Sequence, residues 1–252
     1  MIEKVGAVRD KNLDLIRFIA ISFVVLIHSK GEGIIYTAVP MFVMLSGYLI
    51  IGRADDFASF YRKRLPRILI PFLIWSPIMY LILCKTGRID TPSIQDFLTK
   101  MASTGVHGAY WYVYEIIGLY LLAPFICRLV KALTSKELLL LCVFLLAGYE
   151  LLLFFPENYF LQSFSWRKSI YLFYFILGYY LFLTRTEHRV YSNFILIFLV
   201  LIFAFILLAV QEDLVKKAIM PVASISLFAF LNNIKCKNLP PNLWSCRCCC
   251  KI

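Results

Sequence analysis

Charged residues are scarce in this chain of 252 residues. They make up 16% of the sequence, against about 25% in soluble globular proteins. The hydrophobic set AVILMFWYC accounts for 61%, and the mean hydropathy is +0.79. Together these figures exclude a disordered chain, a coiled coil, a collagen and a disulfide-rich secreted scaffold. They also leave too much apolar surface for a water-soluble globule, so the composition predicts an integral membrane protein.

Acidic residues are the scarcer of the two charge signs. The chain has 15 Asp and Glu against 26 Lys and Arg, a net charge of +11. In a soluble protein that imbalance would indicate nucleic-acid binding. Here the basic residues lie in short segments between apolar runs, which is typical of membrane loops. We therefore predict a lipid bilayer as partner and no nucleic acid.

Eight apolar runs approach the roughly 20 residues that a helix needs to cross a bilayer. They are 13–30, 37–51, 68–84, 109–130, 137–155, 169–184, 193–211 and 218–233. The second is short and the eighth is weak, so a buried or broken helix is possible at both. The fold class predicted is all-α, a polytopic membrane helix bundle of about eight transmembrane helices over residues 1–233.

Loop charge predicts the orientation of the bundle. With the N-terminus in the cytosol, 18 of the 26 Lys and Arg residues fall on the cytosolic side and 8 on the other, in line with the positive-inside rule. No small-residue cleavage site follows the first apolar run, so we expect that span to be retained. The prediction is a multi-pass protein of the cell membrane.

Residues 234–252 differ in composition from the rest of the chain. Five of the eight cysteines fall there, without the paired C-x₂-C spacing of a zinc site. We expect no bound metal or cofactor. Palmitoylation of these cysteines stays open, and our favoured interpretation is an unstructured or aberrant cytosolic tail.

The first apolar run carries three ionisable residues, Asp14, Arg17 and His28. Arg17 and His28 are eleven residues apart, so on a helix they point within about 20° of each other, about 16 Å apart along the axis. Asp14 lies at i−3 from Arg17, where the two can pair. Ionisable groups inside a membrane are candidates for function, and histidine is the natural base near neutral pH. We expect a shared polar path through the bundle. Arg17 also suits a snorkelling anchor and His28 an interfacial residue.

Two later segments offer further candidates. Ser46-Gly47 interrupts an apolar run, which fits either close helix contact or an open helix lining a cavity. Arg64 and Arg67 lie one turn apart in a basic segment that precedes a span with prolines. Two guanidiniums there suit the phosphates of a donor such as coenzyme A, while a cytosolic stop signal touching anionic lipid is the alternative.

Aromatic residues open the fourth apolar run. Tyr110 and Trp111 suit a sugar-stacking platform as well as an ordinary interfacial belt. Glu115, one turn deeper than Trp111, and Glu150, in the fifth run, are intramembrane acids without a partner recognisable from sequence.

Five segments together resemble the acyltransferase type 3 family of integral membrane O-acyltransferases. They are LDLIRFIAISFVVLIH at 13–28, VPMFVMLSGYLI at 39–50, RKRLPRILIPF at 62–72, WYVYEIIGLYLLAP at 111–124 and SIYLFYFILGYYL at 169–181. They match that family's basic-residue–histidine signature, its Ser-Gly-aromatic motif, its Arg-x-x-Arg pattern with a following proline, its aromatic entry and its Phe-x-x-Gly-Tyr span. The resemblance covers about residues 10–185.

The resemblance implies transfer of an acyl group, commonly acetyl, from cytosolic acyl-CoA to a hydroxyl of a lipid-linked or cell-envelope saccharide. It implies His28 as catalytic base and Arg17, Arg64 and Arg67 as donor-binding residues. Asp14 and Ser46 are expected to support the site, and the acceptor would lie against Tyr110, Trp111 and Glu115.

The chain also departs from the family pattern. Family members usually have about ten spans, and a histidine often lies two residues before the tryptophan, where this chain has Ala109 with His107 two residues earlier. We therefore expect a C-terminally truncated member. Two alternatives to an active O-acyltransferase remain open: a transporter or flippase for a lipid-linked saccharide, and an inactive family member.

Overall fold

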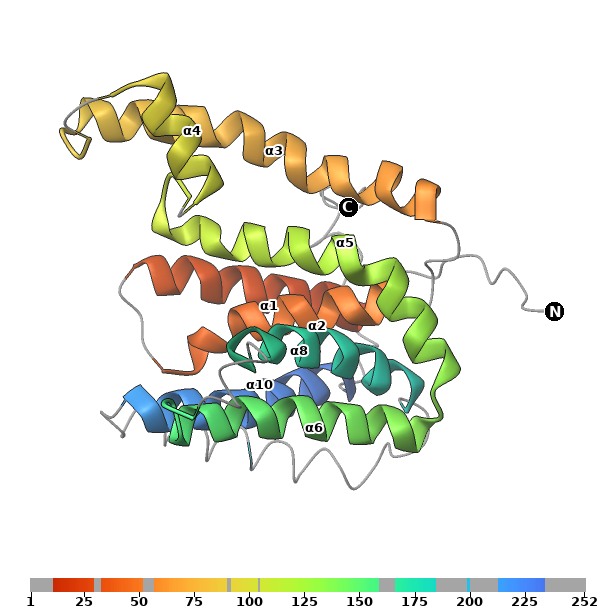
Figure 1. Ribbon diagram of the computed structural model, residues 1–252. Coiled ribbons are helices and arrows are strands. Elements are labelled where there is room, and N and C mark those ends of the chain that lie inside the picture. The colour runs from red at the N-terminus through yellow and green to blue at the C-terminus, as the bar shows by residue number, and fades with distance from the viewer. Residues whose placement is uncertain are drawn as a thin grey trace. The chain divides into compact units, whose positions relative to one another are not determined.

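A computed structural model describes residues 11–29, 33–51, 57–89, 92–103, 105–158, 166–184, 199 and 213–233. These residues form eight α-helices, two short 3₁₀ helices and no strand (Figure 1). The elements are α1 (Lys11–His28), η1 (Gly33–Thr37), α2 (Ala38–Ile50), α3 (Phe57–Lys85), α4 (Ile94–Ala102), η2 (Gly108–Tyr110), α5 (Trp111–Ala132), α6 (Ser135–Phe154), α8 (Trp166–Leu183) and α10 (Asp213–Asn233). The predicted all-α bundle is confirmed.

Among the described residues, four helices are long and apolar enough to cross a membrane. They are Phe57–Lys85, Trp111–Ala132, Ser135–Phe154 and Leu214–Asn233. Two further apolar helices, Ile34–Ile50 and Ser169–Leu181, are shorter, and the 18 residues of α1 include three charges. A multi-pass membrane protein is therefore confirmed, and the count of eight spans stays a prediction. The predicted span 193–211, apart from residue 199, and the tail 234–252 lie outside the described residues.

The described residues form two compact units. Unit 1 comprises those within Met1–Gly52 and Ala132–Cys250, and unit 2 comprises those within Arg53–Lys131. The described helices of unit 1 are α1, α2, α6, α8 and α10, while α3, α4 and nearly all of α5 belong to unit 2.

In unit 1, helix α2 packs closely against α8. A Cβ atom added to Gly47 would lie 1.7 Å from the carbonyl oxygen of Phe175, and one added to Gly178 would lie 1.9 Å from that of Met44. Only glycine fits at both positions, because backbone atoms occupy the space of a side chain. Helix α2 runs unbroken through Ser46-Gly47, so this segment serves close helix contact rather than a break.

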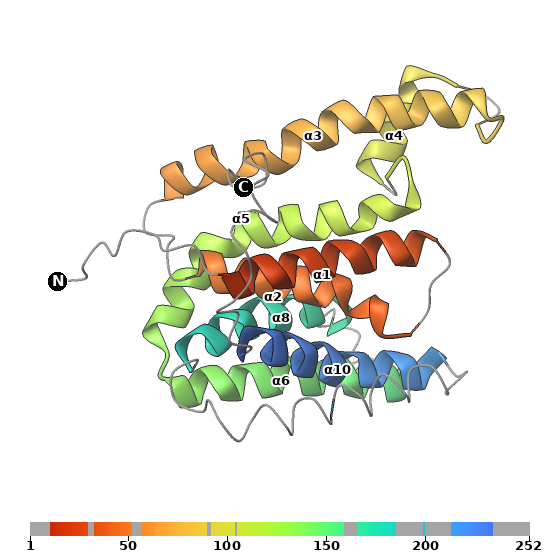
Figure 2. The ribbon, with the colours of Figure 1, turned by 180° about the vertical axis from the view of Figure 1, so that it is seen from behind.

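The other helices of unit 1 surround this pair. Helix α1 packs on α2, α6 packs on α8, and α10 contacts both α1 and α2, as Figure 2 shows from behind. The side-chain amide of Asn12 donates to the backbone carbonyl of Asn232 at 2.6 Å, and this buried bond ties α1 to the end of α10. Likewise, the hydroxyl of Ser169 on α8 donates to the carbonyl of Leu145 on α6 at 3.3 Å.

In unit 2, aromatic rings join α3 to α5. Ring centroids are 5.0 Å apart for Phe57 and Phe125, and 5.3 Å apart for Phe72 and Tyr114. The residue closer to the start of α3 meets the residue closer to the end of α5, so the two helices run antiparallel. The hydroxyl of Tyr61 adds a 2.7 Å hydrogen bond to the carbonyl of Leu121.

Helix α3 begins earlier than its apolar run. The run was predicted at 68–84, but the helix starts at Phe57 and includes Pro66, Pro71 and Pro77. Hydrophobicity marks only the part of a helix that lipid covers. The first turns of α3 are held instead by rings that pack on α5, so the basic segment is helical.

Candidate active site

Helix α1 positions the first group of candidate residues. The guanidinium of Arg17 and the carboxylate of Asp14 form an ion pair with Nη1 and Oδ1 3.0 Å apart. This confirms the pairing predicted from their i, i+3 spacing. The side chain of Asp14 is 17% exposed and that of Arg17 is 38% exposed. One carboxylate therefore orients a cation that still has open donors, since a guanidinium carries five N–H groups.

His28 is the last residue of α1, and its imidazole is fixed by a local contact. Its Nδ1 lies 2.8 Å from the carbonyl oxygen of Val24, one turn earlier. A carbonyl oxygen only accepts hydrogen bonds, so in the neutral ring Nδ1 carries the proton and Nε2 keeps the lone pair. The side chain is exposed, so Nε2 is accessible as a base.

The stripe that joins Arg17 to His28 borders the buried face of α1. That face contains Leu13, Ile16 and Ala20, which pack into unit 1. Arg17 is half-buried and His28 is exposed. The two residues therefore share a side of the helix, as predicted, and they lie at the edge of the buried face rather than within it. Enclosure of both in one polar path stays a prediction.

Ser46 lies on α2 beside Gly47, the residue that packs on α8, and its side chain is half-buried. Its predicted supporting role stays a prediction.

Arg64 and Arg67 belong to unit 2, on the basic first turns of α3. Arg64 is half-buried and Arg67 is exposed, as are Arg62 and Lys63. The 29 residues of α3 extend about 43 Å, which exceeds the roughly 30 Å of a hydrocarbon core. The basic turns therefore project beyond the lipid when residues 68–84 lie within it, where phosphate groups can reach them.

Tyr110 and Trp111 lie at the entry to α5. The ring of Tyr110 packs edge-on against Phe72 with centroids 5.5 Å apart, and its hydroxyl approaches the carbonyl of Trp75 at 3.4 Å. The indole of Trp111 is 43% exposed. Tyr110 therefore belongs to the packing of unit 2, and Trp111 offers the open aromatic surface.

Two neighbours complete this entry. Glu115 is half-buried and has interactions of its own within the protein. The imidazole of His107 meets the ring of Tyr110 edge-on, with centroids 6.2 Å apart. The side chain of Ala109 lies outside the described residues.

The structure thus brings the candidate residues together in three groups. Asp14 and Arg17 share the stripe of α1 with His28, Arg64 and Arg67 share the start of α3, and Tyr110, Trp111 and Glu115 share the start of α5. The first group belongs to unit 1 and the other two belong to unit 2. Within the described residues, no cluster of three His, Cys, Asp or Glu side chains is placed to hold a metal ion.

Sequence reasoning missed a polar group inside unit 1. Tyr174 on α8 is 2% exposed, contacts Ser224 on α10 and lies within electrostatic range of Glu150 on α6. Glu150 was recognised as an intramembrane acid, but the three residues lie on three different helices. The only signal for Tyr174 was a tyrosine within an apolar run, which is too common to single out.

Comparison with known proteins identifies the family of the chain. Residues 10–239 match the profile of the acyltransferase 3 family, described as an acyltransferase domain. No curated protein and no solved structure shows significant similarity to the chain. The matched region contains every candidate residue and all the described helices. The chain therefore belongs to the acyltransferase 3 family and is a membrane acyltransferase.

Proposed function

We propose that the protein transfers an acyl group, most simply acetyl, from acyl-CoA to a hydroxyl of a cell-envelope or lipid-linked saccharide. The observation that carries this proposal is the stripe of α1, where an oriented guanidinium and an accessible imidazole nitrogen share one side of the helix. A cation suits the phosphates of the donor, and a base suits the hydroxyl of the acceptor.

The donor is bound by its phosphates. The cations proposed for the phosphate groups of acyl-CoA are Arg17 in unit 1, which Asp14 keeps in position, and Arg64 and Arg67 in unit 2. The distance of about 16 Å from Arg17 to His28 along the helix is bridged by the pantetheine arm, so the thioester approaches His28 while the nucleotide stays at the basic end.

The acceptor hydroxyl needs a base because its own pKa is too high for attack at neutral pH. Nε2 of His28 takes the hydroxyl proton as the oxygen forms a bond to the thioester carbonyl carbon. The carbon–sulfur bond then breaks, and the imidazolium returns the proton to the departing thiolate. The products are an O-acyl saccharide and free coenzyme A. The open ring of Trp111 stacks on the sugar, with Tyr110 and Glu115 beside it.

The base is tested with His28→Ala in purified protein in lipid nanodiscs, with acetyl-CoA and a saccharide acceptor. General-base catalysis contributes about 10²–10⁴-fold, so ester formation should fall by that factor. Ser29→Ala, a change at the neighbouring exposed residue, is the matched control and should keep its rate. Equal ester formation by His28→Ala and by the unchanged protein, at equal protein amounts, contradicts the proposed base.

The same variant separates this function from transport. A saccharide transporter or flippase needs no catalytic base. That alternative is favoured if the unchanged protein forms no ester and His28→Ala still transports saccharide. An unchanged protein that neither forms ester nor moves saccharide is an inactive family member.

The donor site is tested with Arg67→Gln. Arg62→Gln, at another exposed residue in the first turns of α3, is the matched control. Charge-assisted hydrogen bonds contribute about 1.5–3 kcal/mol, so Arg67→Gln should raise the KM for acyl-CoA by about 10- to 100-fold and change kcat little. Arg62→Gln should leave both constants unchanged. Equal effects of the two variants indicate general attraction by a basic surface rather than a donor site.

We also propose that the N-terminus lies in the cytosol of the cell, where acyl-CoA is made. Reporter proteins fused to the N-terminus test this orientation: a fluorescent protein should fold there, and a periplasmic phosphatase should stay inactive. The opposite pair of results reverses the assignment.

A further inference from the structure

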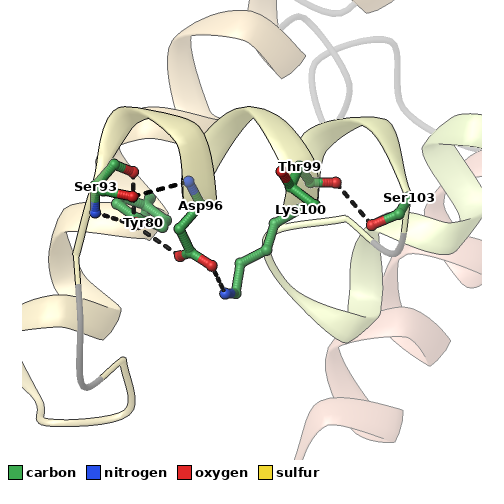
Figure 3. A network of polar contacts seen from close by, with 6 residues as sticks. All are labelled: Tyr80, Ser93, Asp96, Thr99, Lys100 and Ser103. Atoms are coloured by element: carbon green, nitrogen blue, oxygen red, sulfur yellow. Dashed lines mark hydrogen bonds and ion pairs between the residues drawn. The ribbon is translucent and has the colours of Figure 1, made fainter.

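The first turn of helix α4 (Ile94–Ala102) is hydrogen-bonded to the membrane helix α3, as Figure 3 shows. The phenol of Tyr80 on α3 donates to Oδ2 of Asp96 at 2.8 Å and accepts from the backbone N–H of Ser93 at 3.1 Å. Ser93 also caps the helix, because its hydroxyl accepts from the N–H of Asp96 at 3.0 Å. On the other side, Asp96 forms an ion pair with Lys100.

The last turn of α4 is fastened to α5. The phenol of Tyr114, one turn into α5, donates to the carbonyl of Met101 at 2.6 Å. Both ends of α4 are therefore bound to helices that cross the membrane, and in Figures 1 and 2 α4 lies across these helices rather than along them. A helix held in this way has a fixed depth in the bilayer.

The apolar face of α4 is only half covered by protein. Phe97 and Met101 pack against the cluster of Tyr80, Leu83 and Val106. By contrast, Ile94 is 80% exposed and Leu98 is 58% exposed, one turn apart on the same side. Water is a poor environment for such a pair, so the open half of the face needs an apolar partner.

The position of α4 identifies that partner. Tyr80 is five residues before the end of α3 at Lys85, which is about 8 Å along the helix axis. Amphipathic helices at membrane surfaces bury their apolar faces about 5–10 Å into the boundary between headgroups and acyl chains. The exposed cations Lys85 and Arg88 follow, as expected where a span leaves the lipid.

We propose that α4 is an interfacial helix that lies in one leaflet of the bilayer. Ile94 and Leu98 enter the acyl chains, and Gln95 and Thr99, exposed about 100° further round the helix, stay among the headgroups. Since Tyr114 lies one turn beyond Trp111, this seating holds the entry of α5 at the membrane surface. The partner is the lipid itself, through apolar contact.

A photoactivatable residue tests the proposal directly. The full chain is produced with p-benzoylphenylalanine at one position at a time: 94 or 98 on the apolar side, and 95 or 99 on the polar side. Position 75, where Trp75 is 61% exposed on the span of α3, is the positive control for lipid contact. Each protein is placed in nanodiscs of phosphatidylcholine and phosphatidylglycerol, illuminated and examined by mass spectrometry for lipid adducts.

Positions 94, 98 and 75 should each give several-fold more acyl-chain adducts than positions 95 and 99. Three results overturn the proposal. One is an absence of adducts at 94 and 98 while position 75 is labelled. The second is equal labelling at all four positions of α4. The third is crosslinking of 94 or 98 to a second copy of the chain, which would make the open face a dimer contact. Because every variant must elute as folded protein and all are compared with position 75, misfolding does not imitate these results.

Discussion

The two units join their helices in different ways. In unit 1, glycines at 47 and 178 let the backbones of α2 and α8 touch. In unit 2, rings such as those of Phe57 and Phe125 fill the space between α3 and α5. In lipid the hydrophobic effect does not drive helices together, so contact between them depends on close packing or on hydrogen bonds. Among the described contacts, the backbones of α2 and α8 touch in unit 1, whereas side chains separate the backbones of α3 and α5 in unit 2.

This difference matters for the proposed chemistry. Backbone contact leaves no room for sliding, so α2 and α8 form a rigid base on which α1 presents Arg17 and His28. In unit 2 the proposed acceptor residue Tyr110 is held by its ring, which packs on Phe72, and by its hydroxyl, which approaches the carbonyl of Trp75.

The largest expected effect comes from adding one methyl group to the close contact of unit 1. Gly47→Ala places a Cβ 1.7 Å from the carbonyl oxygen of Phe175, so the two helices must separate. Overpacking commonly costs about 1–3 kcal/mol and more when backbone must move, and we expect about 3 kcal/mol or more. Thermal unfolding in detergent, followed by loss of monodisperse protein, measures it.

Gly118→Ala is the matched control for this variant in unit 2. A Cβ at position 118 meets nothing within 4 Å, and alanine favours helix by about 1 kcal/mol over glycine. Its melting temperature should stay level or rise. Equal losses for the two variants would mean that close packing does not distinguish the units.

The second effect concerns the hydrogen bond between α1 and α10 in unit 1. Asn12→Leu removes the donor to the carbonyl of Asn232 and leaves that carbonyl buried. An unsatisfied buried acceptor costs about 1–3 kcal/mol, so the melting temperature should fall, though less than in Gly47→Ala. Ser29→Ala, at the exposed residue that follows α1, is the matched change and should have little effect. An unchanged melting temperature in Asn12→Leu would show that α10 is held by packing alone.

The third and smaller effect concerns the tyrosines of unit 2. Tyr61→Phe keeps the ring but removes the hydrogen bond to the carbonyl of Leu121. A single hydrogen bond contributes about 0.5–1.5 kcal/mol net, so we expect a loss of about 1 kcal/mol. Tyr36→Phe, an exposed tyrosine in unit 1, is the control. A loss as large as that of Gly47→Ala would show that unit 2 depends on one bond more than its ring packing indicates.

Local patterns in the sequence predicted much of this architecture. Apolar runs located most helices to within a few residues, because lipid selects for them directly. The i, i+3 spacing of Asp14 and Arg17 predicted an ion pair that depends on one helix only. The Ser46-Gly47 step indicated close contact, although nothing in the sequence named α8 as the partner.

The features that the sequence did not predict depend on contacts between helices or on weak local signals. Helix α4 has only nine residues, too few to appear among the apolar runs. The start of α3 was missed because prolines and cations interrupt its pattern, and packing against α5 maintains it. The contact of Tyr174 with Ser224, near Glu150, joins three helices that are distant in the sequence, and no periodicity reports such a meeting.

The smallest expected effect is the pH dependence of the junction between α3 and α4. Two hydrogen bonds lower the pKa of Asp96 below its ordinary value. The bond from Lys100 has the larger effect, and the bond from Tyr80 adds to it. The folded protein therefore holds the carboxylate charged where the unfolded chain would begin to protonate it. The junction contributes its stability above a pH of about 3.9, the unfolded value, and loses it as the pH falls through the lower folded pKa.

Asp96→Asn tests this linkage because an amide still accepts from Tyr80 but carries no charge for Lys100. As the pH falls from about 6, melting temperatures should fall more for the unchanged protein than for the variant, so the two curves should approach each other. Other carboxylates titrate in both proteins and cancel in the difference. Parallel curves would mean that the ion pair adds nothing, and that Tyr80 and the packing of Phe97 alone hold α4 in place.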